Sequence, residues 1–257
     1  MIQKENEKFV ASNILEGMTS ISAVLNSGCE NDRKIQSIWI DLDKKKSKAS
    51  EISFLRAKSK ELGFSIDFVS HEKIDEISVG NTHGGILAFC SERNIPVLSA
   101  ESIHPKSFYV FLEGIEDPYN FGYTLRSLYA AGVSGVIIPP RNWMTAAGVV
   151  ARASAGASEL MPLYTADAET AIDLFKASDY QVLCAGIRDS VSIYEQRFPY
   201  PILLVIGGEK RGISRNLLEK ADQIVRIDYG RSFRGSLSAA SAATVMAFEI
   251  FRQNLIE

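Results

Sequence analysis

The chain has 257 residues, 46% of them hydrophobic, and a net charge of −3. This length and composition suit one large or two modest domains with apolar cores. The charge excludes a protein that is basic over its whole surface, although RNA binding needs only a local basic patch. The apolar runs are far shorter than the ~20 residues of a membrane span, and the charged N-terminus lacks the apolar centre of a signal peptide. We therefore expect a cytoplasmic protein with no membrane segment.

Cysteines and histidines are few and widely spaced. The chain has three cysteines, which are Cys29, Cys90 and Cys184. Their odd number and wide spacing favour neither a disulfide framework nor a zinc site. They fit reduced thiols in the cytosol. The three histidines show no spacing typical of metal ligands. We therefore expect no bound metal.

Residues 1–100 alternate between strand and helix patterns. Hydrophobic periodicity predicts helices over 12–27, 50–62 and 71–77 and strands over 35–42, 65–69 and 85–90. This order favours a small α/β sandwich domain, followed by a linker over 101–106 that contains Pro105. The lysine-rich segment Lys44–Lys48 fits either contact with RNA phosphates or an ordinary solvated loop.

Residues 107–257 form a second series of alternating elements. We predict strands over 108–112, 133–138, 180–185, 201–206 and 224–227, and helices over 120–131, 146–157, 169–177, 214–221 and 237–255. Such alternation favours a mostly parallel sheet covered by helices on both faces. Arginine makes up 11 of the 15 basic residues after residue 105 and three of the 13 before it. This bias fits recognition of phosphate or carboxylate groups, or simple drift in composition.

The first segment that could carry chemistry is Asn120-Phe-Gly-Tyr-Thr-Leu-Arg126. Turn-forming residues precede it directly after a strand. Asn120 and Arg126 lie one and a half to two helical turns apart, close enough to converge on one pocket. The alternative is a well-capped helix start with an exposed arginine.

Two glycine-rich segments follow later in the chain. Ile206-Gly-Gly-Glu-Lys-Arg-Gly-Ile213 follows a buried strand and fits either a ligand-binding turn or any tight turn between a strand and a helix. It lacks the Lys-Ser/Thr ending of a Walker loop. In Gly235-Ser-Leu-Ser-Ala-Ala-Ser-Ala242, Ser236 is the predicted helix N-cap and the small residues permit close packing.

The order and content of these three segments resemble the motifs of the SpoU (TrmH-type) RNA ribose methyltransferases of the SPOUT superfamily. The resemblance implies a C-terminal α/β domain with a trefoil knot over 107–257, a homodimer with a site completed across the interface, and S-adenosylmethionine as methyl donor. Its implied substrate is the ribose 2′-hydroxyl of structured RNA, with rRNA favoured over tRNA. Asn81-Thr-His-Gly-Gly-Ile86 resembles part of the RNA-binding domain that precedes many of these enzymes.

The resemblance also implies roles for individual residues. Arg126 would act on the 2′-hydroxyl, while Asn120, Glu209 and Ser236 shape the catalytic pocket. Turns at strand ends, where open α/β sheets bind ligands, supply the predicted cofactor-binding residues, which are Ala185, Gly186, Ile206, Gly207, Gly208, Glu209, Gly212, Ile213, Ile227, Tyr229, Ser236 and Leu237.

The chain departs from the family pattern at Ser238, where the family has asparagine. A serine lacks the two donors of the amide and its reach. One alternative is therefore a non-catalytic RNA-binding protein of the same fold, which would bind the cofactor without transferring a methyl group. Another is an unrelated α/β enzyme that binds a nucleotide phosphate at its glycine-rich turns, which nucleotide binding would reveal.

Overall fold

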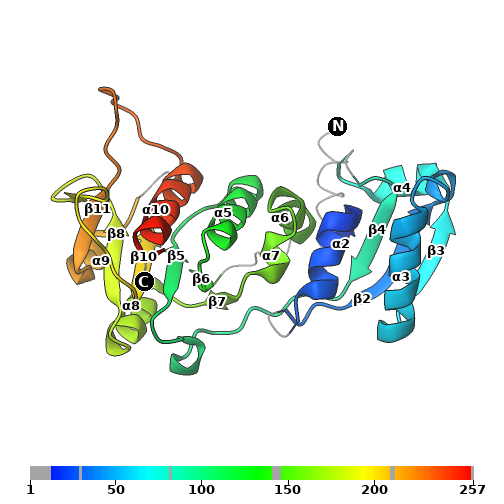
Figure 1. Ribbon diagram of the computed structural model, residues 1–257, viewed down its shortest axis with the longest axis horizontal. Helices are drawn as coiled ribbons and strands as arrows, with labels where there is room; N and C mark the ends of the chain where they lie inside the picture. The colour runs from blue at the N-terminus through cyan, green and yellow to red at the C-terminus, as the bar shows by residue number, and fades with distance from the viewer. Residues whose placement is uncertain (1–12, 29–30, 81–82, 141–145, 209–211, 256–257) are drawn as a thin grey trace. The chain divides into compact units, whose positions relative to one another are not determined.

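The computed structural model describes residues 13–28, 31–80, 83–140, 146–208 and 212–255 (Figure 1). The chain divides into two compact units. Unit 1 is drawn from the residues up to Asn94 together with 142–160, and unit 2 from 95–141 together with 161–257. Each unit has its own sheet. The predicted α/β class is therefore correct, whereas the predicted domain boundaries at residues 101–106 stay a prediction.

Unit 1 is built on a four-stranded sheet in the order β1-β4-β2-β3. Strand β4 runs antiparallel to both of its neighbours, and β2 runs parallel to β3. Fully buried Leu15, Ile38, Ile40 and Leu55 form part of its core. Its elements are β1 (Ile14–Glu16), α2 (Gly17–Asn26), β2 (Ile35–Asp41), η1 (Leu42–Lys44), α3 (Ala49–Leu62), β3 (Ser65–Val69), α4 (His71–Ile77), β4 (Ile86–Cys90), α6 (Ala147–Ala153) and α7 (Ala157–Leu160).

Two predictions for unit 1 are wrong in detail. The helix predicted over 12–27 begins only at Gly17, because Ile14 and Leu15 pair with β4 as strand β1. The helix predicted over 146–157 is divided into α6 and α7, since Ala155 and Gly156 both have positive φ angles. In both places long-range pairing or backbone turning overrides the local helical pattern.

Unit 2 is built on a seven-stranded sheet in the order β7-β6-β5-β10-β8-β11-β9, with every neighbouring pair parallel. Its elements are η2 (Ala100–Ser102), β5 (Phe108–Leu112), α5 (Pro118–Ala130), β6 (Gly135–Ile138), β7 (Leu163–Thr165), α8 (Ala168–Ala177), β8 (Gln181–Ala185), β9 (Val191–Ser192), β10 (Ile202–Ile206), α9 (Arg215–Lys220), β11 (Gln223–Arg226) and α10 (Ala239–Gln253). The short strands β7 and β9 were not predicted, because two or three residues give no measurable periodicity.

Helices cover both faces of this sheet, as expected for parallel strands. Phe175 of α8 and Leu217 of α9 pack against Tyr109, Val182 and Leu203 on one face. Helices α5 and α10 pack together, and α10 also contacts β10 (Figure 1). The described helices include none that is long and apolar enough to cross a membrane.

Helix α10 begins two residues later than the sequence predicts. Ser238, and not Ser236, is its N-cap, and the Ser238 hydroxyl accepts a hydrogen bond from the backbone N–H of Ser241 at 3.1 Å. Ser236 is left in the preceding loop, where it is exposed.

Candidate functional site

A cavity of about 580 Å³ lies at the carboxyl ends of β8, β10 and β11 in unit 2. Strand β10 is inserted between β5 and β8, although both precede it in the chain. Open α/β sheets bind ligands at such changes of strand order, outside the carboxyl ends of the strands. The lining residues come from the ends of these strands, the loops that follow them and the first half of α10, namely Ala185–Arg188, Ile206–Gly208, Gly212, Ile213, Leu218, Ile224, Arg226, Ile227, Tyr229, Phe233–Leu237, Ala239, Ala242 and Met246.

This cavity brings together the residues predicted to bind a cofactor. Glu209 lies outside the described residues. The other eleven predicted positions all line the cavity, and they are Ala185, Gly186, Ile206, Gly207, Gly208, Gly212, Ile213, Ile227, Tyr229, Ser236 and Leu237. Their roles in binding stay predictions, and their grouping in one cavity is a property of the fold.

Glycines form one wall of the cavity because the backbone there has no room for side chains. A Cβ atom on Gly208 would lie 2.4 Å from the carbonyl oxygen of Gly114. The backbone N–H of Gly212, a residue with φ of +62°, donates a hydrogen bond to the carbonyl of Gly208 at 2.9 Å. The turn after β10 is thus held against the end of β5, with its backbone facing the cavity.

Replacing Gly208 with alanine is expected to weaken cofactor binding and to destabilise unit 2 by roughly 1–3 kcal/mol, the usual cost of overpacking. The new methyl group would meet backbone atoms, which cannot rotate away. Calorimetric titration with S-adenosylhomocysteine and thermal unfolding would measure both effects. Gly230→Ala is the matched control, because a Cβ atom there meets nothing within 4 Å. If Gly208→Ala and Gly230→Ala have the same cofactor affinity and the same thermal stability, the backbone at Gly208 is not tightly packed.

Another part of the lining comes from the loop between β11 and α10. The backbone N–H of Leu237 donates a hydrogen bond to the Tyr229 hydroxyl at 3.2 Å, which joins the two ends of the loop. Arg226 donates to Asp228 at 2.8 Å and to the carbonyl of Ser190. Hydrogen bonds from Ser192 and Arg226 lower the pKa of Asp228.

Asn120 and Arg126 lie elsewhere, on α5. The Asp117 side chain caps this helix by accepting a hydrogen bond from the backbone N–H of Asn120 at 2.8 Å, and Thr124 donates to the Asn120 carbonyl. Arg126 is exposed, and within the described part of the chain its guanidinium makes no hydrogen bond or ion pair. Neither residue lines the cavity of its own chain, and the convergence of Asn120 and Arg126 on one pocket stays a prediction.

The titratable groups beneath the site offer no nucleophile. Burial raises the pKa of the Cys184 thiol to about 12, so this sulfur is protonated at neutral pH. Burial also raises the pKa of the Glu113 carboxyl, an effect opposed by a hydrogen bond from the backbone of Ser214. The described residues contain no group of three or more His, Cys, Asp and Glu side chains that could hold a metal ion.

The lining of the cavity fits S-adenosylmethionine. Apolar side chains such as Ile213, Leu237 and Met246 can enclose a flat adenine ring, and the exposed backbone of the glycine turn can hydrogen-bond its edge. Arg188 and Arg234 also line the cavity and can bind a carboxylate. These two arginines and Phe233 were not among the individual residues predicted to bind the cofactor, although Phe233 and Arg234 lie in the predicted pocket segment 227–237 and the arginine bias of this half was a signal for the arginines.

Two family models match the chain. One, described as the SpoU rRNA methylase family, matches residues 107–248. The chain belongs to the SpoU rRNA methylase family. The other model, described as RNA 2′-O ribose methyltransferase substrate binding, matches residues 14–96. The predicted family and the predicted enzyme class, an RNA ribose 2′-O-methyltransferase, are therefore confirmed.

Relatives of known name agree with this assignment. The chain is 29% identical over 248 residues to the 23S rRNA (guanosine-2′-O-)-methyltransferase RlmB of Shewanella oneidensis, covering 93% of this chain and 97% of that enzyme. It is 32% identical over 199 residues to the RlmB of Salmonella typhi, covering 74% of this chain and 80% of that enzyme.

Solved structures show the same fold. An rRNA methyltransferase from Sinorhizobium meliloti with bound AdoMet (S-adenosylmethionine) matches with a TM-score of 0.78 and 23% identity. The match covers 96% of this chain and 93% of that one. The SpoU methyltransferase AviRb from Streptomyces viridochromogenes, also in complex with AdoMet, matches with a TM-score of 0.76 and 20% identity, covering 96% of each chain. The predicted SPOUT-type fold is confirmed, and the AdoMet complexes agree with the predicted methyl donor.

Proposed function

We propose that the cavity in unit 2 binds S-adenosylmethionine and that the chain transfers its methyl group to a ribose 2′-hydroxyl of ribosomal RNA in the cytoplasm. The observation that carries the proposal is the convergence of the predicted cofactor residues on one cavity at the change of strand order. The relatives named as 23S rRNA methyltransferases support ribosomal RNA over tRNA as the substrate. The 2′-hydroxyl occurs in RNA and not in DNA, so it also defines the class of nucleic acid.

The protein contributes mainly position and charge to this reaction. When bound, S-adenosylmethionine supplies a reactive methyl group on a positively charged sulfur. The glycine turn at Gly207 and Gly208 and the loop that contains Ser236 hold the donor site in place. The acceptor oxygen would take the methyl group and leave the donor as an uncharged thioether, while the hydroxyl proton would pass to water. The exposed guanidinium of Arg126 is suited to orient this hydroxyl through an adjacent phosphate and to stabilise the developing negative charge.

Arg126 can reach a cavity if the protein is a homodimer. It lies on α5 among exposed aromatic side chains, with Tyr119 43%, Tyr123 51% and Tyr129 44% exposed. Residues 119, 123, 126 and 129 are three or four positions apart and so share one helix face. Aromatic side chains and arginine are enriched in protein–protein interfaces. A second copy packed on this face would place Arg126 near the cavity of its partner.

The whole chain is expected to be a dimer at micromolar concentration, measured by light scattering. Tyr123→Arg should weaken association by on the order of 100-fold or more, because burying an unpaired cation costs several kcal/mol. Phe54→Arg is the matched control, since Phe54 is an exposed aromatic residue on α3 of unit 1. A monomeric wild-type protein would overturn the dimer and the shared site together.

One observation favours a second candidate function, that of an RNA-binding protein without methyl-transfer activity. This observation is Ser238, which stands where the family has asparagine. The Ser238 hydroxyl caps α10 and donates to the Ser241 hydroxyl at 3.0 Å, and Ser238 does not line the cavity. Because asparagine and serine cap helices equally well, Ser238→Asn should preserve α10 and keep or raise activity.

The deciding experiment uses ribosomal RNA from a host strain that lacks the gene. Purified protein and S-adenosylmethionine with a labelled methyl group should methylate this RNA at one or few 2′-oxygens, mapped by resistance of the modified linkage to alkali. Cofactor binding without transfer would establish the inactive RNA-binding alternative. If the protein does not bind the cofactor, both the methyltransferase and the inactive RNA-binding alternative are wrong.

A further inference from the structure

The loop between β11 and α10 carries a group of side chains that cofactor binding does not explain. Figure 1 shows this segment as a long loop that extends away from the sheet, between the orange strand and the red helix. Phe233 is 61% exposed, although it is a large apolar side chain, and it lines the cavity with Arg234. An exposed aromatic ring that lines a cavity is available to stack on a planar group of a ligand.

The loop is built to present this ring. Tyr229 and Phe233 lie with their ring centroids 6.0 Å apart. The Leu237 N–H bonds to the Tyr229 hydroxyl and closes the loop behind the ring pair. A Cβ atom on Gly235 would come within 2.5 Å of the Phe233 ring, so the absence of a side chain at Gly235 leaves space for the aromatic group.

The positive charge around the ring is available to a ligand. Arg188, Arg231 and Arg234 are all exposed, and none makes a hydrogen bond or ion pair within the described residues. Arg226 differs, because Asp228 and the carbonyl of Ser190 occupy its donors. Three uncommitted guanidinium groups exceed what the single carboxylate of S-adenosylmethionine can use.

We infer that Phe233 and Arg234 bind the target nucleotide of the RNA, with Phe233 stacking on its base and Arg234 contacting a neighbouring phosphate. This inference rests on the proposed function. Unstacked RNA bases commonly bind aromatic side chains, and arginine binds phosphate through its planar fork of donors. Stacking the base at the mouth of the cavity would present the attached ribose toward the methyl donor. Arg188 and Arg231 would add further phosphate contacts.

The first test compares Phe233→Leu with Phe233→Trp, using ribosomal RNA from the deletion strain. Leucine keeps an apolar side chain but lacks an aromatic face, so the KM for RNA should rise roughly 10- to 100-fold, the effect of losing one stacked base. Tryptophan should retain the wild-type KM. Because Phe233 also lines the cavity, cofactor affinity measured by calorimetry should change by a smaller factor than the KM for RNA, and we expect Phe233→Leu to change it by less than about threefold. A loss of cofactor affinity with an unchanged KM for RNA would instead make Phe233 part of the cofactor site.

The second test measures how RNA affinity depends on salt. Arg234→Gln should lower the slope of log K against log salt by about 1, as expected for the loss of one phosphate contact. Arg252→Gln is the control, since Arg252 is exposed but paired with Glu249. If the wild-type enzyme is active and the Phe233 and Arg234 variants have the same KM for RNA and the same salt dependence, this inference is wrong and the proposed function stands. A wild-type protein that transfers no methyl group would overturn the proposed function, and this inference with it.

Discussion

Replacing Arg126 with alanine is expected to lower the rate of methyl transfer by on the order of 100- to 1000-fold, the usual effect of removing one preorganised electrostatic group. Affinity for S-adenosylmethionine should stay nearly unchanged, because Arg126 does not line the cavity of its own chain. Single-turnover transfer to ribosomal RNA and calorimetry with the cofactor would measure the two effects separately.

Arg126→Lys should also lose most activity, because an ammonium group cannot reproduce the planar fork of guanidinium donors. Arg215→Ala is a suitable control, since the Arg215 side chain is 90% exposed and pairs with Glu219 on its own helix. A wild-type rate in Arg126→Ala would transfer the catalytic assignment to another cation, with Arg234 and Arg231 as the first candidates. A dimer that dissociates in Arg126→Ala would show an interface role instead, so light scattering belongs in the same experiment.

The strands and helices of this chain were largely predictable because their signals are local. The predicted strands over 65–69 and 108–112 have the observed bounds. Residues 108–112 are a buried apolar run, whereas residues 65–69 alternate exposed polar with partly buried apolar side chains, and both patterns are typical of strands. The start of α10 was misplaced because Ser236 and Ser238 are equally good caps by residue type. Only the path of the preceding loop, closed by Tyr229 and Leu237, decides between them.

The features of the site also divide into those that the sequence predicts and those that it does not. The glycine turns at strand ends were predictable, because two backbone segments approach this closely only where a residue has no side chain, as at Gly208. The position of Arg126 relative to the cavity was not predictable, because it depends on how the helices pack and, in the proposed dimer, on a second copy of the chain. The trefoil knot is implied by family membership and stays a prediction, since hydrophobic periodicity carries no information on how a chain threads.

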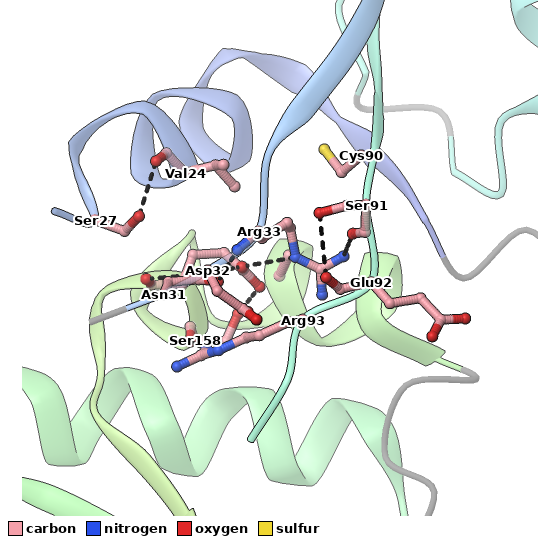
Figure 2. A network of polar contacts seen from close by, with 12 residues as sticks. Val24, Ser27, Asn31, Asp32, Arg33, Cys90, Ser91, Glu92, Arg93 and Ser158 are labelled. Atoms are coloured by element: carbon pink, nitrogen blue, oxygen red, sulfur yellow. Dashed lines mark hydrogen bonds and ion pairs between the residues drawn. The ribbon is translucent and has the colours of Figure 1, made fainter. Parts of the chain in front are cut away.

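The packing of residues 146–160 in unit 1 was the least predictable feature. These residues lie within the matched SpoU methylase range but belong to the compact unit formed by the N-terminal residues. A buried polar network holds them there (Figure 2). The Arg33 Nε atom lies 3.0 Å from Glu159 Oε2, with side chains 1% and 3% exposed. Sequence patterns give no sign of this pair, because its partners are 126 positions apart.

Neighbouring groups make further hydrogen bonds in this network. Asn31 donates to the same Glu159 carboxylate at 2.6 Å, and Arg33 donates to the carbonyl of Ser91 at 3.0 Å. Arg93 donates to the carbonyl of Ser158, the residue that precedes Glu159 in the chain (Figure 2). The Glu159 carboxylate therefore balances a buried cation at the junction between α7 and the N-terminal residues.

Glu159→Ala is expected to destabilise unit 1 by about 3–5 kcal/mol, because removing one partner leaves a buried charge uncompensated. Amide hydrogen exchange would measure this effect separately in each unit, and protection should fall in unit 1 but not in unit 2. Glu61→Ala is the control, since the exposed Lys58–Glu61 pair should contribute little. The double variant Arg33→Met with Glu159→Met should recover much of the lost stability, because an apolar pair removes the unmatched charge. If Glu159→Ala unfolds no more readily than Glu61→Ala, the ion pair does not hold residues 146–160 in unit 1, and apolar contacts such as that of Ala151 with the unit 1 core must do so.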